Sequence, residues 1–245
     1  MVINFKKWTT QKNSVEILKI LDKRCNCYLV TKDNFYVLID TSIAYEKNMI
    51  LNHLDKLNIE KLHCIMLTHS HFDHAGNTQV IQKKFGSNVF IHSSELKYLK
   101  KGYTYLPKGT LPITKLVTSI IGDKIMMFQR YPRCDSDKIF TEENFCDAFP
   151  DILKIQMLHT PGHTTGSVNF IIDNEIAMVG DTVVNRMGHI FPPFADFPEL
   201  LVKAWKKLLD TNCALFLPGH GKEIERNLLE TEYSDIKKNK KFNKT

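Results

Sequence analysis

Three histidines and an aspartate lie within six residues of this sequence, in the segment HSHFDH that follows the apolar run 62–67. His69 and His71 are separated by one residue, and Asp73 and His74 follow at once. Histidine is the commonest metal ligand, and crowded neutral imidazoles are best explained by a shared cation. If the loop leaves the end of a strand, His69 and His71 can converge on one ion while the other two residues project toward a neighbouring position. The segment therefore indicates two adjacent metal sites.

Each ion needs further ligands, and the chain offers three more at similar places. The segments TPGHTTGS, VGDTV and LPGHG present His163, Asp181 and His220 at turns that follow apolar strands. A turn at a strand end is where a rigid sheet can aim a ligand. In TPGH and LPGH a Pro-Gly pair turns the histidine outward, so these two turns look like equivalent corners. The alternative interpretation is a set of surface histidines at a helix start, which suits a single histidine better than this cluster.

The pattern resembles that of the metallo-β-lactamase fold superfamily, whose signature is H-x-H-x-D-H followed by a separate His, an Asp and a final His. The resemblance extends from the LIDTS strand, where Asp40 matches the first acidic position of the family, to PGHG. It implies that one metal is held by His69, His71 and His163. It implies that the second is held by Asp73, His74 and His220, with Asp181 bridging the two. Asp40 is then expected to hydrogen-bond within the site without touching a metal.

Two dications roughly 3.5 to 4 Å apart can share a water and lower its pKa enough to supply hydroxide near neutral pH. This chemistry predicts a dinuclear metal-dependent hydrolase in which metal-bound hydroxide attacks an ester, thioester or lactone, and in which Asp73 orients the nucleophile. Two divalent ions are expected as cofactors. Zinc is the expected metal, while iron and manganese are compatible with the same His and Asp ligands.

Departures from particular branches of the superfamily limit the substrate. Zinc β-lactamases generally carry Cys or Ser where this chain has Asp181, so penicillin-type activity is not expected. The site looks more like that of glyoxalase II and the lactonases, but only 25 residues follow His220, which leaves a glutathione thioester open. The alternatives are a phosphodiester hydrolase, a mononuclear iron enzyme similar to persulfide dioxygenases, and a metal-binding module without catalysis.

Strands and helices alternate along the chain, which favours an α/β layered fold. The resemblance implies a four-layer αββα sandwich with the metals at one edge between the sheets. Hydrophobic patterns predict strands and helices as follows. Strands are expected at 25–30, 34–40, 62–67, 88–92, 152–158, 167–172, 175–180 and 213–217, and helices at 48–58, 78–85, 198–210 and from about 224.

Residues 1–245 are expected to form one domain. The region 93–149 is less periodic, with Gly102, Pro107, Gly109 and Pro112 interrupting it, and is expected to be an insertion that covers the substrate. Its tyrosines and an aromatic run after Asp181 are candidates for substrate contacts, with packing onto the core as the alternative. These candidates are Tyr98, Tyr103, Tyr105, His189, Phe191, Phe194 and Phe197. Trp205 is expected in the core, and His53, His63, His92 and His159 are expected to be structural.

The composition is typical of a globular protein, and the partner expected from the resemblance is a small-molecule substrate. The formal charge is +6, but five lysines lie in the segment 237–245, and the rest of the chain has 28 basic and 27 acidic residues. That balance gives little support to nucleic-acid binding, and the lysine run is interpreted as a flexible tail. No apolar run suits a membrane span or a secretion signal, so a cytoplasmic location is expected and the six cysteines are expected to be free thiols. The oligomeric state stays open.

Overall fold

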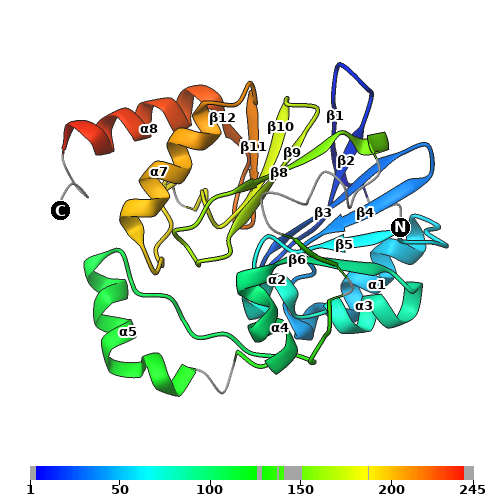
Figure 1. The fold of residues 1–245 in the computed structure, drawn as a ribbon, viewed down its shortest axis with the longest axis horizontal. Helices are drawn as coiled ribbons and strands as arrows, with labels where there is room; N and C mark the ends of the chain where they lie inside the picture. Colours follow the sequence, from blue (N-terminus) through cyan, green and yellow to red (C-terminus); the bar gives the residue numbers. More distant parts are fainter. Residues whose placement is uncertain (1–3, 126–128, 137, 141–150, 187, 240–245) are drawn as a thin grey trace.

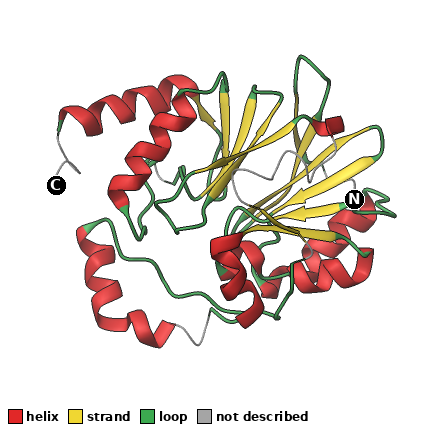
Figure 2. Cartoon of the chain, in the orientation of Figure 1, coloured by secondary structure: helices red, strands yellow, loops and turns green. Residues whose placement is uncertain are grey.

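Two β-sheets lie face to face, and helices cover the outer side of each (Figure 1). The structure is a computed structural model that describes residues 4–125, 129–136, 138–140, 151–186 and 188–239. In Figure 2 the strands of both sheets occupy the middle of the molecule and the helices its periphery. This arrangement is the four-layer αββα sandwich that was predicted.

The first sheet has seven strands in sequential order. Neighbours from β1 to β4 pair antiparallel, and those from β4 to β7 pair parallel. The strands are β1 (Lys6–Thr9), β2 (Glu16–Asp22), β3 (Asn26–Lys32), β4 (Phe35–Ile39), β5 (Cys64–Met66), β6 (Asn88–His92) and β7 (Lys138–Phe140). The parallel connections carry α1 (Lys47–Lys56), α2 (Phe72–Ala75), α3 (Thr78–Phe85), α4 (Leu96–Lys101) and α5 (Pro112–Ile125).

The second sheet has five strands in the order β12, β11, β10, β9 and β8. Only β10 and β11 pair parallel, and α7 connects them. Its elements are β8 (Ile155–His159), β9 (Val168–Ile172), β10 (Ile176–Gly180), α7 (Pro198–Leu209), β11 (Leu215–Pro218), β12 (Ile224–Glu225) and α8 (Arg226–Lys238). Single helical turns of the 3-10 type are η1 (Ala44–Glu46), η2 (Ser93–Glu95) and η4 (Asp151–Leu153).

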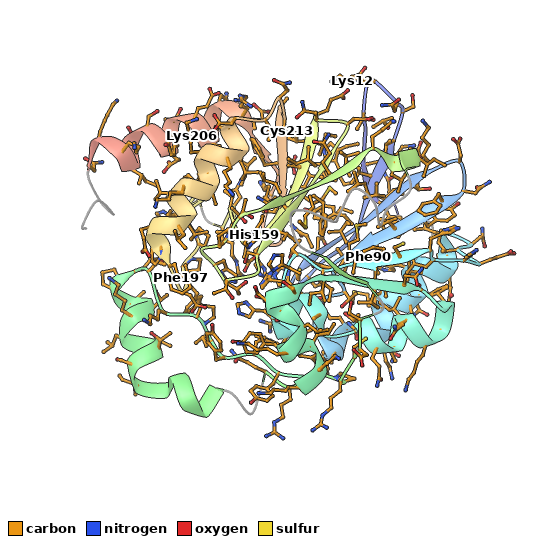
Figure 3. The ribbon with its side chains drawn as sticks, viewed as in Figure 1. Lys12, Phe90, His159, Phe197, Lys206 and Cys213 are labelled. Carbon is orange, nitrogen blue, oxygen red and sulfur yellow. The ribbon has the colours of Figure 1, made fainter. Side chains whose placement is uncertain are left out.

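Three buried clusters hold these layers together. The central cluster lies between the sheets and joins residues such as Val30 of β3 to Phe170 of β9. A second cluster packs the first sheet against α1 and α3, and a third packs the second sheet against α7 and α8. Alternate residues of β3 enter different clusters, because successive side chains of a strand point to opposite faces. Both faces of that strand are covered, which explains its continuous apolar sequence. Figure 3 shows side chains filling the space between the layers, with Phe90 labelled in the first sheet.

All the strands and helices that were predicted are present, with ends shifted by a few residues. The hairpin of β1 and β2 was not predicted. Its second strand has a register shift between Lys19 and Leu21, so Ile17 packs between the sheets while Ile20 and Leu21 face the helices. A bulge of this kind interrupts the alternation of period two from which strands are recognised.

The region 93–149 contains more regular structure than its sequence indicated. Gly102 ends α4 in the left-handed conformation, with φ of +71°, and Pro112 is the first residue of α5. Both residues bound helices here, in the positions that glycine and proline favour. Helix α5 exposes several apolar side chains, including Ile113 and Ile120, so it lacks the two-sided pattern by which a packed helix is recognised. Residues 126–128, 137 and 141–149 of this region lie outside the described residues.

The lysine-rich segment 237–245 is helical at its start, because α8 extends to Lys238. Residues 240–245 lie outside the described residues. The five cysteines in the described ranges are free, as expected, and Cys146 lies outside them. In the described part of the chain, no helix combines the length and the apolar character that crossing a membrane requires.

Candidate metal centre

All seven side chains predicted as ligands come together at one edge of the two sheets. His69 and His71 lie in the loop after β5, and Asp73 and His74 lie on the short helix α2 that follows. The other three come from the second sheet, at the turns after β8, β10 and β11. These three are His163, Asp181 and His220. Each side chain is therefore aimed by the end of a strand or by the first helical turn after it.

Three imidazoles meet at one point of this edge. His71 Nδ1 lies 3.0 Å from His69 Nε2 and 2.9 Å from His163 Nε2. All three residues are buried. Nitrogen ligands of a tetrahedral zinc ion with bonds of 2.0 to 2.1 Å are about 3.3 Å apart, so this spacing fits a shared cation.

Hydrogen bonds on the far side of two of these rings fix which nitrogen faces the others. His163 Nδ1 donates to the carbonyl oxygen of Phe194 at 2.9 Å. His69 Nδ1 donates to Thr68 Oγ1 at 3.1 Å, and that hydroxyl in turn donates to Asp40 Oδ2 at 2.8 Å. In neutral imidazoles the opposite nitrogens then carry lone pairs, and these point at His71 Nδ1. A proton on His71 Nδ1 could serve only one of these lone pairs at a time, whereas a cation can accept all three nitrogens at once.

The second group of side chains lies beside the first. His220 Nε2 is 3.3 Å from Asp73 Oδ2 and 3.5 Å from Asp181 Oδ1, and His74 Nε2 is 3.4 Å from that same oxygen. The other oxygen of Asp181 is 3.5 Å from His163 Nε2 in the first group. Asp181 Oδ1 is buried and has no hydrogen-bond partner among the described residues. The carboxylate thus lies between the two groups, and a buried acceptor of this kind fits a cation.

Asp40 hydrogen-bonds within the site, as the resemblance implied, and its partner there is His74. His74 Nδ1 donates to Asp40 Oδ2 at 2.8 Å, which leaves Nε2 facing Asp181. The backbone N–H of Thr68 donates to Asp40 Oδ1 at 2.9 Å. Asp40 is buried and has a φ of +59°, a conformation that Asp and Asn adopt more readily than most residues.

The site divides its imidazoles into neutral and charged ones. Burial lowers the pKa of His71 to about 3, and the nearby His163 imidazole lowers it further than burial alone would. Burial also lowers the pKa of His220, but the carboxylates of Asp181 and Asp73 outweigh it and raise that pKa to about 10. The pKa of His74 is likewise raised, because Asp181 and Asp40 outweigh burial. A metal ion at the second group therefore competes with protons on its histidines.

The carboxylates carry the complementary charge. Burial raises the pKa of Asp73, but its hydrogen bond with His220 and the charges of His74 and His220 together outweigh burial and lower the pKa to about 2. The pKa of Asp181 is held well below its ordinary value against burial, chiefly by the charges of His220 and His74. Both groups are thus ionised at neutral pH, as hard oxygen ligands must be.

The glycine of LPGHG allows the final histidine to approach so closely. A Cβ atom on Gly219 would lie 2.5 Å from His74 Cε1 and 2.8 Å from Asp181 Oδ1. The glycine of TPGH meets a different neighbour, since a Cβ on Gly162 would lie 2.6 Å from the backbone nitrogen of Leu201. The two corners both turn a histidine toward the site, but by different local packing.

A buried glutamate that the sequence did not indicate joins two of the ligand loops. Glu95 accepts a hydrogen bond from the backbone N–H of Ser70 at 3.1 Å with one oxygen, and from Gly166 N–H at 3.1 Å with the other. Tyr131 Oη donates to the carbonyl oxygen of Ser70 at 2.6 Å. Ser70 lies between His69 and His71, so these bonds fix the loop. Nothing in the local sequence HSSEL signals this role.

A pocket of about 180 Å³ opens onto five of the seven side chains, namely His71, Asp73, His163, Asp181 and His220. Its other walls are largely apolar, and it is lined in addition by Phe72, Tyr105, Leu106, Pro107, Gln129, Val184, Arg186, Pro192, Pro193 and Phe194. Tyr105 Oη donates to Asp196 Oδ2 at 2.7 Å, which fixes that ring. Such a pocket beside a metal group suits a small ligand with an apolar part.

Only some of the aromatic candidates line this pocket. Tyr105 and Phe194 do, whereas Phe191 packs against Trp205 and Tyr98 against Tyr105. Phe197, labelled in Figure 3 at the start of α7, is 38% exposed. The aromatic candidates therefore differ in role: Tyr105 and Phe194 can contact a substrate, whereas Phe191 packs onto the core.

The other histidines lie outside the cluster. His189 is exposed, and its backbone pairs with that of Arg186. His159 stacks on His92 with ring centroids 4.3 Å apart, and its Nε2 donates to the carbonyl oxygen of Thr165. Trp205 is fully buried and donates from Nε1 to the carbonyl oxygen of Thr182, the residue after Asp181.

Two further residues near the site were not predicted to belong to it. Cys25 Sγ is buried and lies 3.5 Å from His74 Nδ1, and burial raises the pKa of this thiol well above its ordinary value. Gln129 is 2% exposed, lines the pocket and has an Oε1 atom without a hydrogen-bond partner among the described residues. Both come from segments far from the ligands in sequence, so only the fold brings them near.

Comparison with known proteins places this geometry in context. The family model described as the metallo-beta-lactamase superfamily matches residues 21–220. A probable metallo-hydrolase of Methanocaldococcus jannaschii is 26% identical over 206 residues, covering 82% of this chain and 89% of the relative. The hydroxyacylglutathione hydrolase GloC of Haemophilus influenzae is 25% identical over 221 residues, covering 85% and 91%.

Solved structures share the fold. A metallo-beta-lactamase superfamily protein from Sulfolobus tokodaii has a TM-score of 0.63 at 18% identity, covering 91% of this chain and 85% of its own. The subclass B3 metallo-beta-lactamase BJP-1 of Bradyrhizobium japonicum has a TM-score of 0.64 at 16% identity, covering 96% and 92%. At these identities the likeness concerns the fold alone.

Proposed function

Because the chain belongs to the metallo-beta-lactamase superfamily and is a metal-dependent hydrolase, we propose that it holds two divalent metal ions and hydrolyses a thioester or ester. The first ion would be held by His69, His71 and His163. The second would be held by Asp73, His74 and His220, with Asp181 between them. The single observation that carries this proposal is the meeting of three ring nitrogens at 2.9 and 3.0 Å beside a buried carboxylate oxygen for which the described residues provide no hydrogen-bond partner.

Two bound dications would supply Lewis acidity and a water acidic enough to react near neutral pH. The chain's own residues do the rest. Asp73 is ionised, so its carboxylate would accept a hydrogen bond from that water and orient it. The second hydrogen bonds of His69, His74 and His163 hold each ring in the tautomer that a ligand needs.

In the proposed reaction water adds to the acyl carbon and the bond from carbon to sulfur or oxygen breaks. The products are a carboxylic acid and a thiol or alcohol, and the departing atom takes one proton of the water. No oxidant or further cofactor is needed. Zinc is the proposed metal, because His and Asp ligands suit it.

The apolar pocket supports an acyl substrate. Leu106, Pro107 and Phe194 line it beside the proposed metal ligands and can pack against the apolar part of an acyl group. The similarity to a hydroxyacylglutathione hydrolase over 85% of the chain supports a thioester in particular. The nearness of both ligand groups to Asp181 supports two ions over the single iron of a dioxygenase.

The proposal is tested by metal analysis of the purified protein together with a panel of substrates. We expect two metal equivalents and turnover of thioesters or carboxyl esters, with lactones and activated phosphodiesters as comparison substrates. One iron equivalent with oxygen consumption on a persulfide would replace the proposal by a dioxygenase. A protein with two metals that hydrolyses only the phosphodiesters would overturn the acyl substrate while leaving the metal centre.

A further inference from the structure

A second pocket lies on the other side of His220 from the apolar one. It has a volume of about 280 Å³ and is lined by Lys19, Asp22, Lys23, Arg24, Asn26, Arg186, Gly219, His220, Gly221 and Lys222. His220 and Arg186 line both pockets, so the two spaces adjoin at these side chains. We call this second space the basic pocket.

The basic pocket concentrates positive charge. Four lysine and arginine groups besides Arg186 line it, while Asp22 is its one acidic residue. Asp22 pairs with Lys19 at 3.8 Å. Across the described ranges, no carboxylate pairs with Lys23, Arg24 or Lys222. The chain before residue 237 has 28 basic and 27 acidic residues, so this cluster is a local excess and not a reflection of overall composition.

The walls of the basic pocket are fixed to the metal centre by a buried residue. Asn26 Nδ2 donates to the carbonyl oxygens of Pro218 at 2.8 Å and Gly221 at 2.9 Å. Its backbone N–H donates to the carbonyl oxygen of Gly219 at 2.7 Å. These bonds join the turn between β2 and β3, which carries Lys23 and Arg24, to the corner that carries His220.

The third wall is fixed in a similar way. The backbone N–H of Asn185 donates to the carbonyl oxygen of His220 at 2.9 Å, which places Arg186 beside the same corner. Gly221 permits this contact, because it has a φ of +90° and a Cβ there would lie 1.7 Å from the carbonyl oxygen of Asn185. The Lys and Arg side chains of the basic pocket thus extend from backbone that is already fixed before a ligand binds. This reduces the free energy that binding would otherwise spend on ordering the loops.

From this arrangement we propose that the substrate carries a phosphate group on its leaving-group side, bound in the basic pocket while the acyl group lies in the apolar pocket. The inference rests on the proposed function. Unpaired Lys and Arg side chains gathered around one space attract a multiply charged anion, and arginine forks match phosphate oxygens. The basic pocket meets the metal centre at His220, a member of the second ligand group, whereas the remaining walls of the other pocket are largely apolar. A phosphorylated thiol or alcohol therefore fits the basic side and the acyl part fits the apolar side.

The test uses pairs of thioesters that differ only in phosphate. The same short acyl group is attached to pantetheine, which has no phosphate, and to 4′-phosphopantetheine. We expect the metal-loaded protein to prefer the phosphorylated thioester by tenfold or more in kcat/KM. In the double variant Lys23→Gln, Arg24→Gln the ratio between the two substrates falls close to one.

A matched control removes the same charge elsewhere. The double variant Lys237→Gln, Lys238→Gln acts in the last turn of α8, at the end of the chain and away from β2 and β3 (Figure 1), and should keep the full preference. Equal kcat/KM for both thioesters in the wild type would refute the phosphate site and leave the hydrolase proposal standing. A preference that survives in the Lys23 and Arg24 variant would also refute it.

Binding separates this inference from the activity on which it rests. If neither thioester is turned over, calorimetry with free pantetheine and 4′-phosphopantetheine still tests the pocket. Tenfold tighter binding of the phosphorylated compound to the wild type, lost in the Lys23 and Arg24 variant, would support the phosphate site although the proposed reaction is wrong. Equal binding of the two compounds would refute the phosphate site, while the hydrolase proposal is decided separately by the metal analysis and the substrate panel.

Discussion

The carboxylate of Glu95 accepts a hydrogen bond from the backbone N–H of Ser70 at 3.1 Å and thereby holds the residue between His69 and His71. Its other oxygen holds Gly166, three residues after His163. One buried carboxylate therefore fixes the spacing between loops that carry all three imidazoles of the first group. The position of a metal-ligating side chain depends on the hydrogen bonds that support it.

Glu95→Gln should weaken zinc binding by about 10- to 100-fold. The amide replaces one acceptor oxygen by a donor, which would face the N–H of Ser70 or of Gly166. Competition for zinc with a coloured chelator measures the effect. Glu60→Gln, at an exposed position before β5, is the control and should bind zinc as the wild type does. Unchanged affinity in Glu95→Gln would mean that the loop needs no such support.

Asp40→Asn should reduce zinc content from two equivalents toward one after dialysis. Asp40 Oδ2 accepts from both His74 Nδ1 and Thr68 Oγ1, and an amide cannot satisfy all the donors that face it. Asparagine tolerates the positive φ of this position, so the backbone need not change. Zinc analysis by atomic emission gives the result, and Asp55→Asn, in an exposed pair with Lys84, is the matched control. Two equivalents in Asp40→Asn would contradict the expected role.

Asp181→Ala and His71→Ala should each lower kcat/KM for hydrolysis by at least about 100-fold. Asp181 lies between the two groups, and His71 Nδ1 is the nitrogen on which the other two imidazoles of its group converge. Steady-state kinetics on the best thioester or ester measures the loss, and circular dichroism checks the fold. Full turnover by either variant would rule out the proposed mechanism.

The seven clustered residues could be found from the sequence because each follows a strand that the sequence also indicates. Apolar segments such as 62–67 and 213–217 mark the strands, and a histidine directly after each strand end is then aimed at the same edge of the fold. The supporting residues Glu95 and Gln129 could not be found in this way. Their roles depend on which segments the fold places together, which the local sequence around each residue does not indicate.

The fold was predictable where both faces of a strand are buried and less so where the pattern is mixed. β2 has a bulge that turns Ile20 and Leu21 toward the helices, which breaks the alternation expected of a strand. α5 exposes Ile113 and Ile120, so its apolar residues do not mark a packed face. The basic pocket was missed for a third reason, since Lys23, Arg186 and Lys222 are far apart in the chain and overall charge is nearly balanced.

Gln129→Leu should raise both the unfolding temperature and KM. Gln129 is almost fully buried, its Oε1 has no hydrogen-bond partner in the described ranges, and such an acceptor costs roughly 1 to 3 kcal/mol. Leucine removes that cost, but it also removes the polar group that the pocket offers to a substrate donor. Thermal unfolding and steady-state kinetics measure the two effects, with the exposed Gln156→Leu as the control. A lower unfolding temperature with an unchanged KM would show that Gln129 serves the fold only.

The metal-free protein should be most stable near pH 6.5 and lose stability on both sides. The folded pKa of His71 is lowered to about 3, so below the unfolded value of about 6.5 the unfolded chain binds a proton that the folded chain does not. Stability then falls with decreasing pH by about 1.4 kcal/mol per pH unit for this imidazole. The pKa of His69 is lowered too, chiefly by burial, and adds to the fall.

Above pH 6.5 the sign reverses, because the folded pKa of His220 is raised to about 10 and that of His74 is raised as well. Their contribution to stability is complete below the unfolded pKa and is lost as pH rises toward the folded one.

Thermal unfolding of chelator-treated protein at about pH 5, 6.5 and 8 measures the loss of stability on the acid side and on the alkaline side of pH 6.5, here called the acid limb and the alkaline limb. His220→Gln should flatten the alkaline limb and leave the acid one. Zinc should invert the alkaline limb, because the ion replaces the protons on these histidines and binds more tightly as they leave. A zinc-loaded protein whose unfolding temperature still falls from pH 6.5 to 8 would contradict the assignment of His74 and His220 as ligands.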